Sequence, residues 1–138
     1  MKNLISIIIS TLFFYFPSHA QTSQTIPFQA TVMDSSANLV SNQNISVRIT
    51  IHDSPSRTIL YQETQSVNTN DQGQFTVTIG SGTVVSGTYP FSGTGWEGNP
   101  MYAQFEIDKT GGTNYARMVL RGCNATLQPN MNLRYCHN

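Results

Sequence analysis

Apolar and polar residues alternate along four segments of the chain, and this alternation predicts β-strands. The segments are 26–33, 44–53, 74–79 and 101–108. The pattern is clearest in the second of them, where Ile45, Val47, Ile49 and Ile51 are separated by Ser46, Arg48, Thr50 and His52. A period of two directs one set of side chains into a core and the other set toward water. We therefore expect four half-buried strands, with His52 among the solvent-facing residues.

Two weaker patterns and a set of turns complete the expected topology. Further strands are expected over 58–69 and 115–120, and neither shows which of its faces is inside. Residues that favour tight turns separate the strands at 34–38, 53–56, 70–73 and 110–113. We expect each of the last three turns to connect antiparallel neighbours within one sheet.

These elements predict an all-β fold. No apolar stripe of helical period occurs in 21–120, and about six or seven short strands with regular turns are typical of a single antiparallel β-sandwich, immunoglobulin-like or transthyretin-like. The long connection 80–100 is unusual in length. It is rich in glycine and aromatic residues, and we expect a short strand at Val84 and Val85 and part of the segment folded over one end of the sandwich.

The first 20 residues have the features of a cleaved signal peptide. Lys2 precedes an apolar stretch over 4–16, and the small residues Ser18 and Ala20 occupy the positions that signal peptidase reads. We therefore expect a secreted or cell-surface protein. No later apolar run is long enough to cross a bilayer, so no membrane span is expected in the mature chain.

Charge excludes one class of partner. Seven basic and seven acidic residues give a formal net charge of +0, and only 10% of the chain is charged. Nucleic-acid binders carry a basic patch that neutralises phosphates. The chain has no Lys/Arg cluster of that kind, and we expect no nucleic-acid partner.

Several strand and turn motifs resemble a known module. They are Phe28-Gln29-Ala30, Ile45-Ser46-Val47-Arg48-Ile49, Tyr61-Gln62-Glu63-Thr64, Gly73-Gln74-Phe75, Trp96-Glu97-Gly98-Asn99-Pro100-Met101-Tyr102 and Gly111-Gly112-Thr113-Asn114-Tyr115. Over roughly 26–118 the chain is similar to the N-terminal β-sandwich module of secreted and surface multidomain Bacteroidetes proteins. The resemblance implies a domain without catalytic activity, placed ahead of repeat, fibre or sorting domains. After Met118 the chain departs from this pattern, and we hypothesise a truncated or frame-disrupted copy.

The domain organisation follows from these observations. We assign a signal peptide to 1–20, the β-sandwich domain to 21–120 and an atypical C-terminal tail to 121–138. The tail holds both cysteines of the chain, Cys123 and Cys136. In an exported protein they are expected to form a disulfide, which would stabilise the tail by about 3 kcal/mol in the loop-entropy model. Two unpaired thiols are the alternative.

No candidate for catalysis or metal binding stands out. The pair His52-Asp53 has no accompanying nucleophile motif, and nothing in the spacing of the carboxylates selects a catalytic pair from Glu63, Glu97, Glu106 and Asp108. Asp34, Asn38 and Asp71 could offer oxygen ligands to Ca²⁺, but side-chain capping of turns explains them better. The cysteines lack the paired spacing of zinc sites. We expect no enzyme, no metal and no cofactor.

Aromatic residues in the long connection and the strand after it give the candidate ligand-binding set: Tyr89, Phe91, Trp96 and Tyr102. Exposed, these rings could stack on sugars; buried, they would close one end of the sandwich. The leading hypothesis is a structural or adhesion-type module that contacts protein partners, or a cell-surface assembly, at strand edges or loops. An unpaired edge over 102–108 would favour strand addition. A carbohydrate-binding module using the aromatics around Trp96 is the alternative, with a glycan as partner.

Overall fold

The computed structural model describes residues 25–53, 58–88, 90–94, 100–116, 119–125 and 131–133, and for the last two ranges it describes the backbone alone. The described elements are β1 (Ile26–Met33), β2 (Asn44–Asp53), β3 (Ile59–Asn68), β4 (Gln74–Ile79), β5 (Thr83–Ser86), a single-turn 3-10 helix η1 (Phe91–Gly93), β6 (Met101–Asp108), β7 (Val119–Ala125) and β8 (Met131–Leu133). The prediction of an all-β chain is confirmed.

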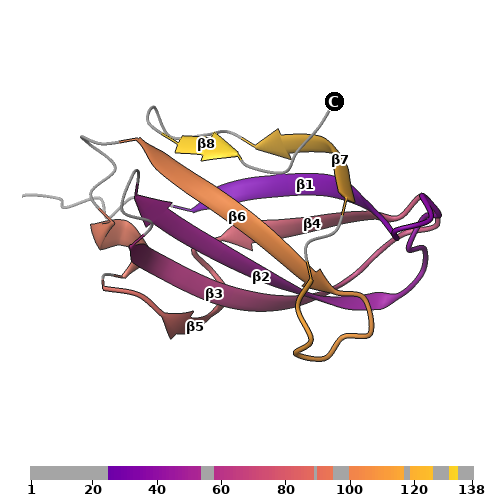
Figure 1. The fold of residues 1–138 in the computed structure, drawn as a ribbon, viewed down its shortest axis with the longest axis horizontal. Coiled ribbons are helices and arrows are strands. Elements are labelled where there is room, and N and C mark those ends of the chain that lie inside the picture. The colour runs from indigo at the N-terminus through magenta and orange to yellow at the C-terminus, as the bar shows by residue number, and fades with distance from the viewer. Residues whose placement is uncertain are drawn as a thin grey trace, which may run out of the picture.

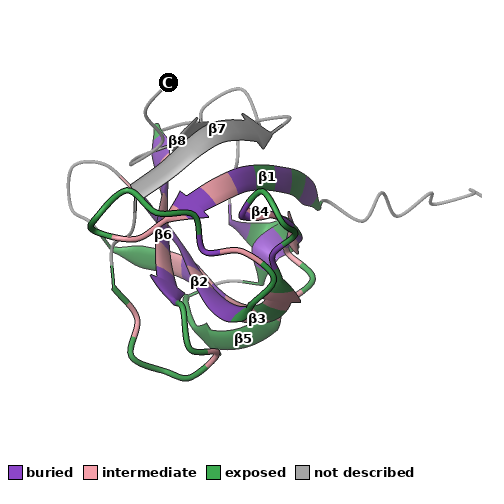
Figure 2. Cartoon of the chain, turned by 90° about the vertical axis from the view of Figure 1, so that its right-hand side faces the viewer, coloured by how far each residue is buried: buried purple, intermediate pink, exposed green. Residues whose placement is uncertain are grey.

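The strands form two sheets packed face to face. The small sheet has the order β4-β1-β7 and the large sheet the order β5-β3-β2-β6-β8. All pairs are antiparallel except β6 with β8, which is parallel. Figure 2 shows β1 and β4 in one layer and β2, β3 and β5 in the other, with buried residues on β1 and β2. The predicted β-sandwich is therefore confirmed.

The core lies between the sheets and is built from the alternating apolar residues. Phe28 of β1 is fully buried, and its ring stacks on that of Phe105 of β6 with 4.1 Å between centroids. Phe75 of β4 packs beside Phe28 at 6.1 Å. Burying an aromatic or aliphatic side chain of this size contributes about 1.5–3 kcal/mol. Phe28 thus joins the two sheets at the centre of the core.

The outer face of β2 is less exposed than the alternation predicts. Ser46, Thr50 and His52 were expected to face water, but they are only 8%, 6% and 7% exposed, respectively. The prediction was wrong for His52 because β2 is the central strand of the large sheet. Side chains from β3 and β6 on either side cover its polar face, and the His52 ring stacks on that of Tyr102, 5.7 Å away.

The structure tests the expected turns unequally. The turn expected over 53–56 lies mostly outside the described residues, but the strands on either side of it, β2 and β3, pair in one sheet. The 70–73 turn leads from β3 in the large sheet to β4 in the small one, and 110–113 follows β6 toward β7 in the small sheet. The expectation of sheet neighbours was wrong for 70–73, because turn-forming residues mark a reversal of the chain without selecting the partner of the next strand. After 110–113 the chain does pair antiparallel with β6, through the single bridge between Ala116 and Ile107, before it continues to β7.

The C-terminal part of the chain contributes strands to both sheets. A strand was expected over 115–120, whereas Ala116 forms an isolated bridge with Ile107 and β7 begins at Val119. β7 pairs with β1, and β8 pairs with the start of β6. The domain boundary drawn after residue 120 therefore falls inside β7.

Removing the ring of Phe28 is expected to destabilise the fold. Phe28→Ala deletes the stack on Phe105 and leaves a cavity between the sheets, which should lower the free energy of unfolding by about 3–5 kcal/mol. Equilibrium unfolding in urea measures the change. The neighbouring variant Gln29→Ala removes an exposed side chain of the same strand and should change it by less than about 0.5 kcal/mol; equal losses in the two variants would contradict this account of the core.

Candidate functional site

β5 is the end strand of the large sheet, and it carries the most exposed apolar side chains in the described part of the chain. All four of its residues are exposed, with Val84 at 60% and Val85 at 58%. The pairing of β5 with β3 is irregular between Gln62 and Glu63, and it leaves Val85 without a partner residue beside the paired Val84. A free sheet edge also presents main-chain N–H and C=O groups that can pair with another strand.

The turn that leads into β5 is fixed by close packing. Gly80 has φ of 96°, a conformation that L side chains rarely adopt, and a Cβ built there would lie 2.4 Å from the ring of Phe91. A Cβ on Gly82 would lie 2.8 Å from the carbonyl oxygen of Thr64. Glycine is therefore needed for the chain to leave β4 and return along β3 as β5.

A buried carboxylate, that of Glu63, holds the same turn. Glu63 lies on β3, is 0% exposed, and accepts hydrogen bonds from the backbone N–H groups of Gly80 (3.1 Å to Oε1) and Gly82 (2.8 Å to Oε2). The Tyr61 hydroxyl donates to Oε2 at 2.7 Å, and the Gln65 amide donates to Oε1 at 2.9 Å. A buried carboxylate is costly unless it is hydrogen-bonded. We call these five residues the Glu63 network.

The Glu63 network also closes the side of the sandwich between the sheets. The Gln65 amide donates a second hydrogen bond, 2.7 Å long, to the carbonyl oxygen of Thr78 on β4. Burial, and then the hydrogen bond to the Glu63 carboxylate, raise the pKa of Tyr61 well above its usual range. Tyr61 therefore stays protonated and serves as a permanent donor. The positions of β4 and β5 beside β3 therefore depend on this set of polar side chains.

Sequence reasoning considered Glu63 only as a member of a carboxylate pair. The signal that could have found its role is its spacing, because residues 61, 63 and 65 share one face of a strand. The sequence does not show which face of 58–69 is buried, because polar residues occur on both of its faces. The other carboxylates of that set lie elsewhere: Glu106 and Asp108 are on β6, and Glu97 is outside the described residues.

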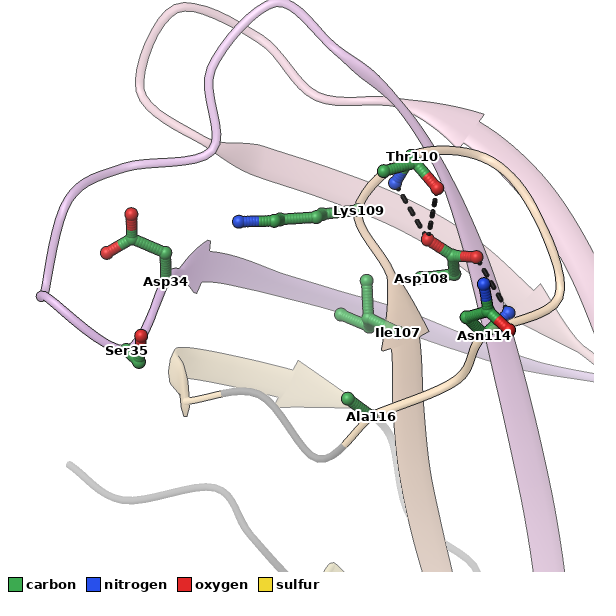
Figure 3. A pocket seen from close by; sticks show the side chains of 8 residues that line it. All are labelled: Asp34, Ser35, Ile107, Asp108, Lys109, Thr110, Asn114 and Ala116. Carbon is green, nitrogen blue, oxygen red and sulfur yellow. Dashed lines mark hydrogen bonds between the residues drawn. The ribbon is translucent and has the colours of Figure 1, made fainter.

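A cleft of about 320 Å³ opens where β1 and β6 end (Figure 3). Its lining residues are Asp34, Ser35, Ile107, Asp108, Lys109, Thr110, Asn114 and Ala116. Ile107 and Ala116 supply apolar surface, and the Lys109 side chain extends across the opening toward Asp34. The size suits a small molecule, so the state of the polar groups decides what chemistry the cleft offers.

The two carboxylates in the cleft accept hydrogen bonds that fix the backbone of the adjoining loops. Asp108 accepts hydrogen bonds from the N–H and hydroxyl of Thr110 (2.9 and 2.6 Å) and from the N–H of Asn114 (2.8 Å). Asp34 accepts from the N–H groups of Ser36 and Asn38, both at 2.9 Å.

These bonds favour the ionised forms of the two acids. The hydrogen bonds from Thr110 hold the pKa of Asp108 below its usual range, and the N–H of Asn38 is the main cause that lowers the pKa of Asp34. A general acid at neutral pH needs a raised pKa, so the two carboxylates are suited to fixing loops. This agrees with the interpretation of Asp34 as a turn cap.

The structure separates the aromatic residues that sequence analysis grouped. Phe91 is 5% exposed and packs edge-on against Tyr61 with 5.1 Å between ring centroids. It is a core residue, which is the buried alternative for these rings, and it is not placed to stack on a ligand. Tyr102 lies on the outer face of the large sheet against His52. Tyr89 and Trp96 lie outside the described residues. Phe91 is the first residue of η1, directly after Pro90, and its ring packs against Gly80. No spacing rule in the sequence indicated this role.

The edge expected at 102–108 is largely covered. β6 pairs with β2 along its length, with β8 over Met101–Ala103 and with Ala116 at Ile107. The end strands of the large sheet are β5 and β8, and of these β5 is the one whose side chains are described. Of the two cysteines, Cys123 falls on β7, where the backbone alone is described, and Cys136 lies outside the described residues, so the disulfide stays a prediction.

The described residues contain no helix long and apolar enough to span a membrane. They also contain no cluster of three or more His, Cys, Asp or Glu side chains placed to hold a metal ion.

Glu63→Gln is expected to loosen the turn before β5. The amide keeps the shape of the side chain but removes the charge and places an NH₂ group where donors converge, so the free energy of unfolding should fall by about 2 kcal/mol. Amide hydrogen exchange at Gly80 and Gly82 should accelerate. Glu106→Gln, at a half-exposed ion pair, should cost less than about 1 kcal/mol and leave these amides unchanged. Unchanged exchange in Glu63→Gln would contradict the assigned role.

Acid is expected to weaken the loops that line the cleft. Because the pKa of Asp108 and that of Asp34 are lower in the folded protein, the stabilisation is complete above the unfolded value of about 3.9 and is lost as pH falls through the lowered values. Urea unfolding measured from neutral pH down to about pH 2 should show this loss. Asp108→Asn should remove part of that pH dependence, and a slope identical to that of the parent chain would contradict the assignment.

Residues 27–121 match DUF8740, a domain of unknown function. The match runs from β1 into β7 and includes the Glu63 network and β5. No protein of curated function and no solved structure matches the chain. The likeness to Bacteroidetes surface modules stays a prediction. Since the matched residues make up more than half of the 138-residue chain, the protein belongs to the DUF8740 family.

Proposed function

We propose that the chain is a non-catalytic, adhesion-type module of an exported protein, and that it binds a partner protein by adding an extended strand of that partner to the free edge of β5. The observation that carries the proposal is the exposure of the whole strand, with its two valines 60% and 58% exposed. Peptide recognition by strand addition uses main-chain hydrogen bonds for affinity and alternate side chains for specificity.

The sequence of β5 supports a binding role. Exposed edges are normally protected by short strands, β-bulges, lysine, proline or inward-pointing charge, because an apolar edge invites pairing with other chains. β5 is short and its pairing with β3 is irregular, but Thr83-Val84-Val85-Ser86 contains no lysine, proline or charged residue. A strand of four residues offers few main-chain hydrogen bonds, so contacts of the partner with the exposed side chains of Val84 and Val85 would supply much of the affinity.

The edge is also held in place before any partner arrives. The carboxylate of Glu63 fixes Gly80 and Gly82, and β5 pairs with β3 from Gln62 to Thr64. Fixing a binding segment in advance lowers the entropy lost on association. The Glu63 network thus supports recognition at β5.

The acidic groups support a module without catalysis. Glu63, Asp34 and Asp108 each accept several hydrogen bonds from the chain's own backbone, which commits them to structure. The features of a signal peptide over 1–20 favour a partner outside the cell or on its surface.

Photo-crosslinking in the organism that makes the protein tests the proposal. A photo-reactive amino acid replaces Val84, and irradiation of the exported protein is expected to yield an adduct with another polypeptide. The added substitution Val85→Lys should remove the adduct by placing a charge on the edge, whereas Val85→Thr should preserve it.

The control places the same photo-reactive amino acid at Gln29, which is exposed on the outer face of the small sheet. An adduct of twice the chain's mass would identify a second copy as the strand donor and would support strand addition. Adducts equally abundant at Gln29, or insensitive to Val85→Lys, would overturn the proposal.

A further inference from the structure

We infer that the outer face of the large sheet is a binding site for a neutral oligosaccharide. The site lies where β3, β2 and β6 run side by side (Figure 1). The residues that carry the argument are Arg48, Thr50, Gln62, Tyr102, Gln104 and Glu106, and we call them the outer-face site. It occupies a different surface from the edge of β5, so it would give the module a second ligand.

Strand register places these side chains in parallel rows. Thr50 of β2 lies opposite Gln62 of β3 on one side and Gln104 of β6 on the other. The next row pairs Arg48 with Glu106. On the other side of the central row, Tyr102 lies opposite His52. Even-numbered residues of β2 point away from the core, so all three rows share the outer face.

Contacts between neighbours fix these side chains. Two nitrogens of the Arg48 guanidinium lie 2.8 and 2.9 Å from one carboxylate oxygen of Glu106, and the guanidinium carbon lies 4.5 Å from the centre of the Tyr115 ring. The Gln62 amide donates to the Thr50 hydroxyl at 2.8 Å. These bonds form a second packed layer outside the sheet. A preorganised polar surface loses less entropy on binding than one of mobile side chains.

The central row also contains a group with bonding capacity to spare. Gln104 is half-buried between the ion pair and the ring of Tyr102, and its side-chain amide makes no hydrogen bond to any described residue. An amide carries two donors and an acceptor. At this position they are available to a ligand that lies along β6.

The chemistry of the outer-face site favours sugar hydroxyls. Each hydroxyl both donates and accepts, and amide, carboxylate and guanidinium groups supply both functions in flat arrays. The charges of Arg48 and Glu106 cancel, so the site does not select a phosphate or a polyanion. The half-buried ring of Tyr102, which rests on the buried ring of His52, provides an apolar surface with a polar rim for the face of a sugar ring.

The length of the site indicates an oligosaccharide. Tyr102 and Glu106 are four residues apart on one strand, which corresponds to about 13 Å along the sheet. A single sugar ring could contact the aromatic pair or the ion pair, but a chain of several rings is needed to contact both. We therefore expect affinity to grow with the length of the sugar chain.

Titration of the isotope-labelled, exported protein by NMR tests the site. The probes are cellohexaose, xylohexaose, mannohexaose and maltohexaose, with glucose as the single-ring comparison. At least one hexasaccharide is expected to shift amide signals of β2, β3 and β6 and to bind more tightly than glucose. Gln104→Ala removes an amide without a protein partner, and it should weaken binding by about tenfold while the thermal unfolding midpoint stays unchanged.

Gln29→Ala is the matched control, since Gln29 is an exposed amide on the central strand of the small sheet. It should leave the affinity unchanged. Tyr102→Phe, which keeps the ring and removes only the hydroxyl, should bind within a few-fold of the parent, and Tyr102→Ala should bind at least tenfold more weakly. The inference is overturned if no hexasaccharide binds at millimolar concentration, or if Gln104→Ala and Gln29→Ala have equal effects.

Discussion

The buried carboxylate of Glu63 is the constraint on which the arrangement of this sandwich most depends. A charge at 0% exposure can be kept only where donors surround it. Here the donors come from two places: Tyr61 and Gln65 on the same strand, and Gly80 and Gly82 in the turn between the sheets. Satisfying one side chain therefore fixes the route by which the chain leaves the small sheet. The position of β5 follows from that route.

The aromatic core and the Glu63 network are connected. Phe91 packs against Tyr61 and lies against the face of Gly80 that has no side chain, so the ring, the phenol and the carboxylate form one unit at the side of the sandwich. Phe28 and Phe105 hold the two sheets together at the centre. The proposed binding edge thus rests on the same packing that stabilises the fold, which explains how a strand so exposed can keep a defined position.

Low charge has two consequences in this structure. With few ionisable groups, the chain uses hydroxyls and amides to cover the central strand of the large sheet, and it uses the carboxylates of Asp34, Glu63 and Asp108 to hold turns. The outer face becomes an ordered polar layer in which one ion pair is balanced. Such a surface is suited to neutral, hydroxyl-rich ligands, whereas the edge of β5 is suited to a polypeptide.

The sequence by itself determined the strands and their buried faces. Alternation in 26–33, 44–53, 74–79 and 101–108 identifies the side of each strand that faces the core, because a strand has a period of two, and the bounds found for these strands agree with it. It does not predict how far the other side is covered, as Ser46, Thr50 and His52 show. Even the short strand at Val84 and Val85 was predicted. Only the tertiary structure decided which strands are neighbours, since the same turn residues serve a hairpin and a crossing between sheets. Tertiary contacts also decided the roles of individual side chains. Phe91 is a core residue, His52 is covered by Tyr102, and Glu63 accepts hydrogen bonds from backbone N–H groups 17 and 19 residues away. Side-chain partners that distant in sequence depend on how the sheets pack, and no local pattern encodes that packing.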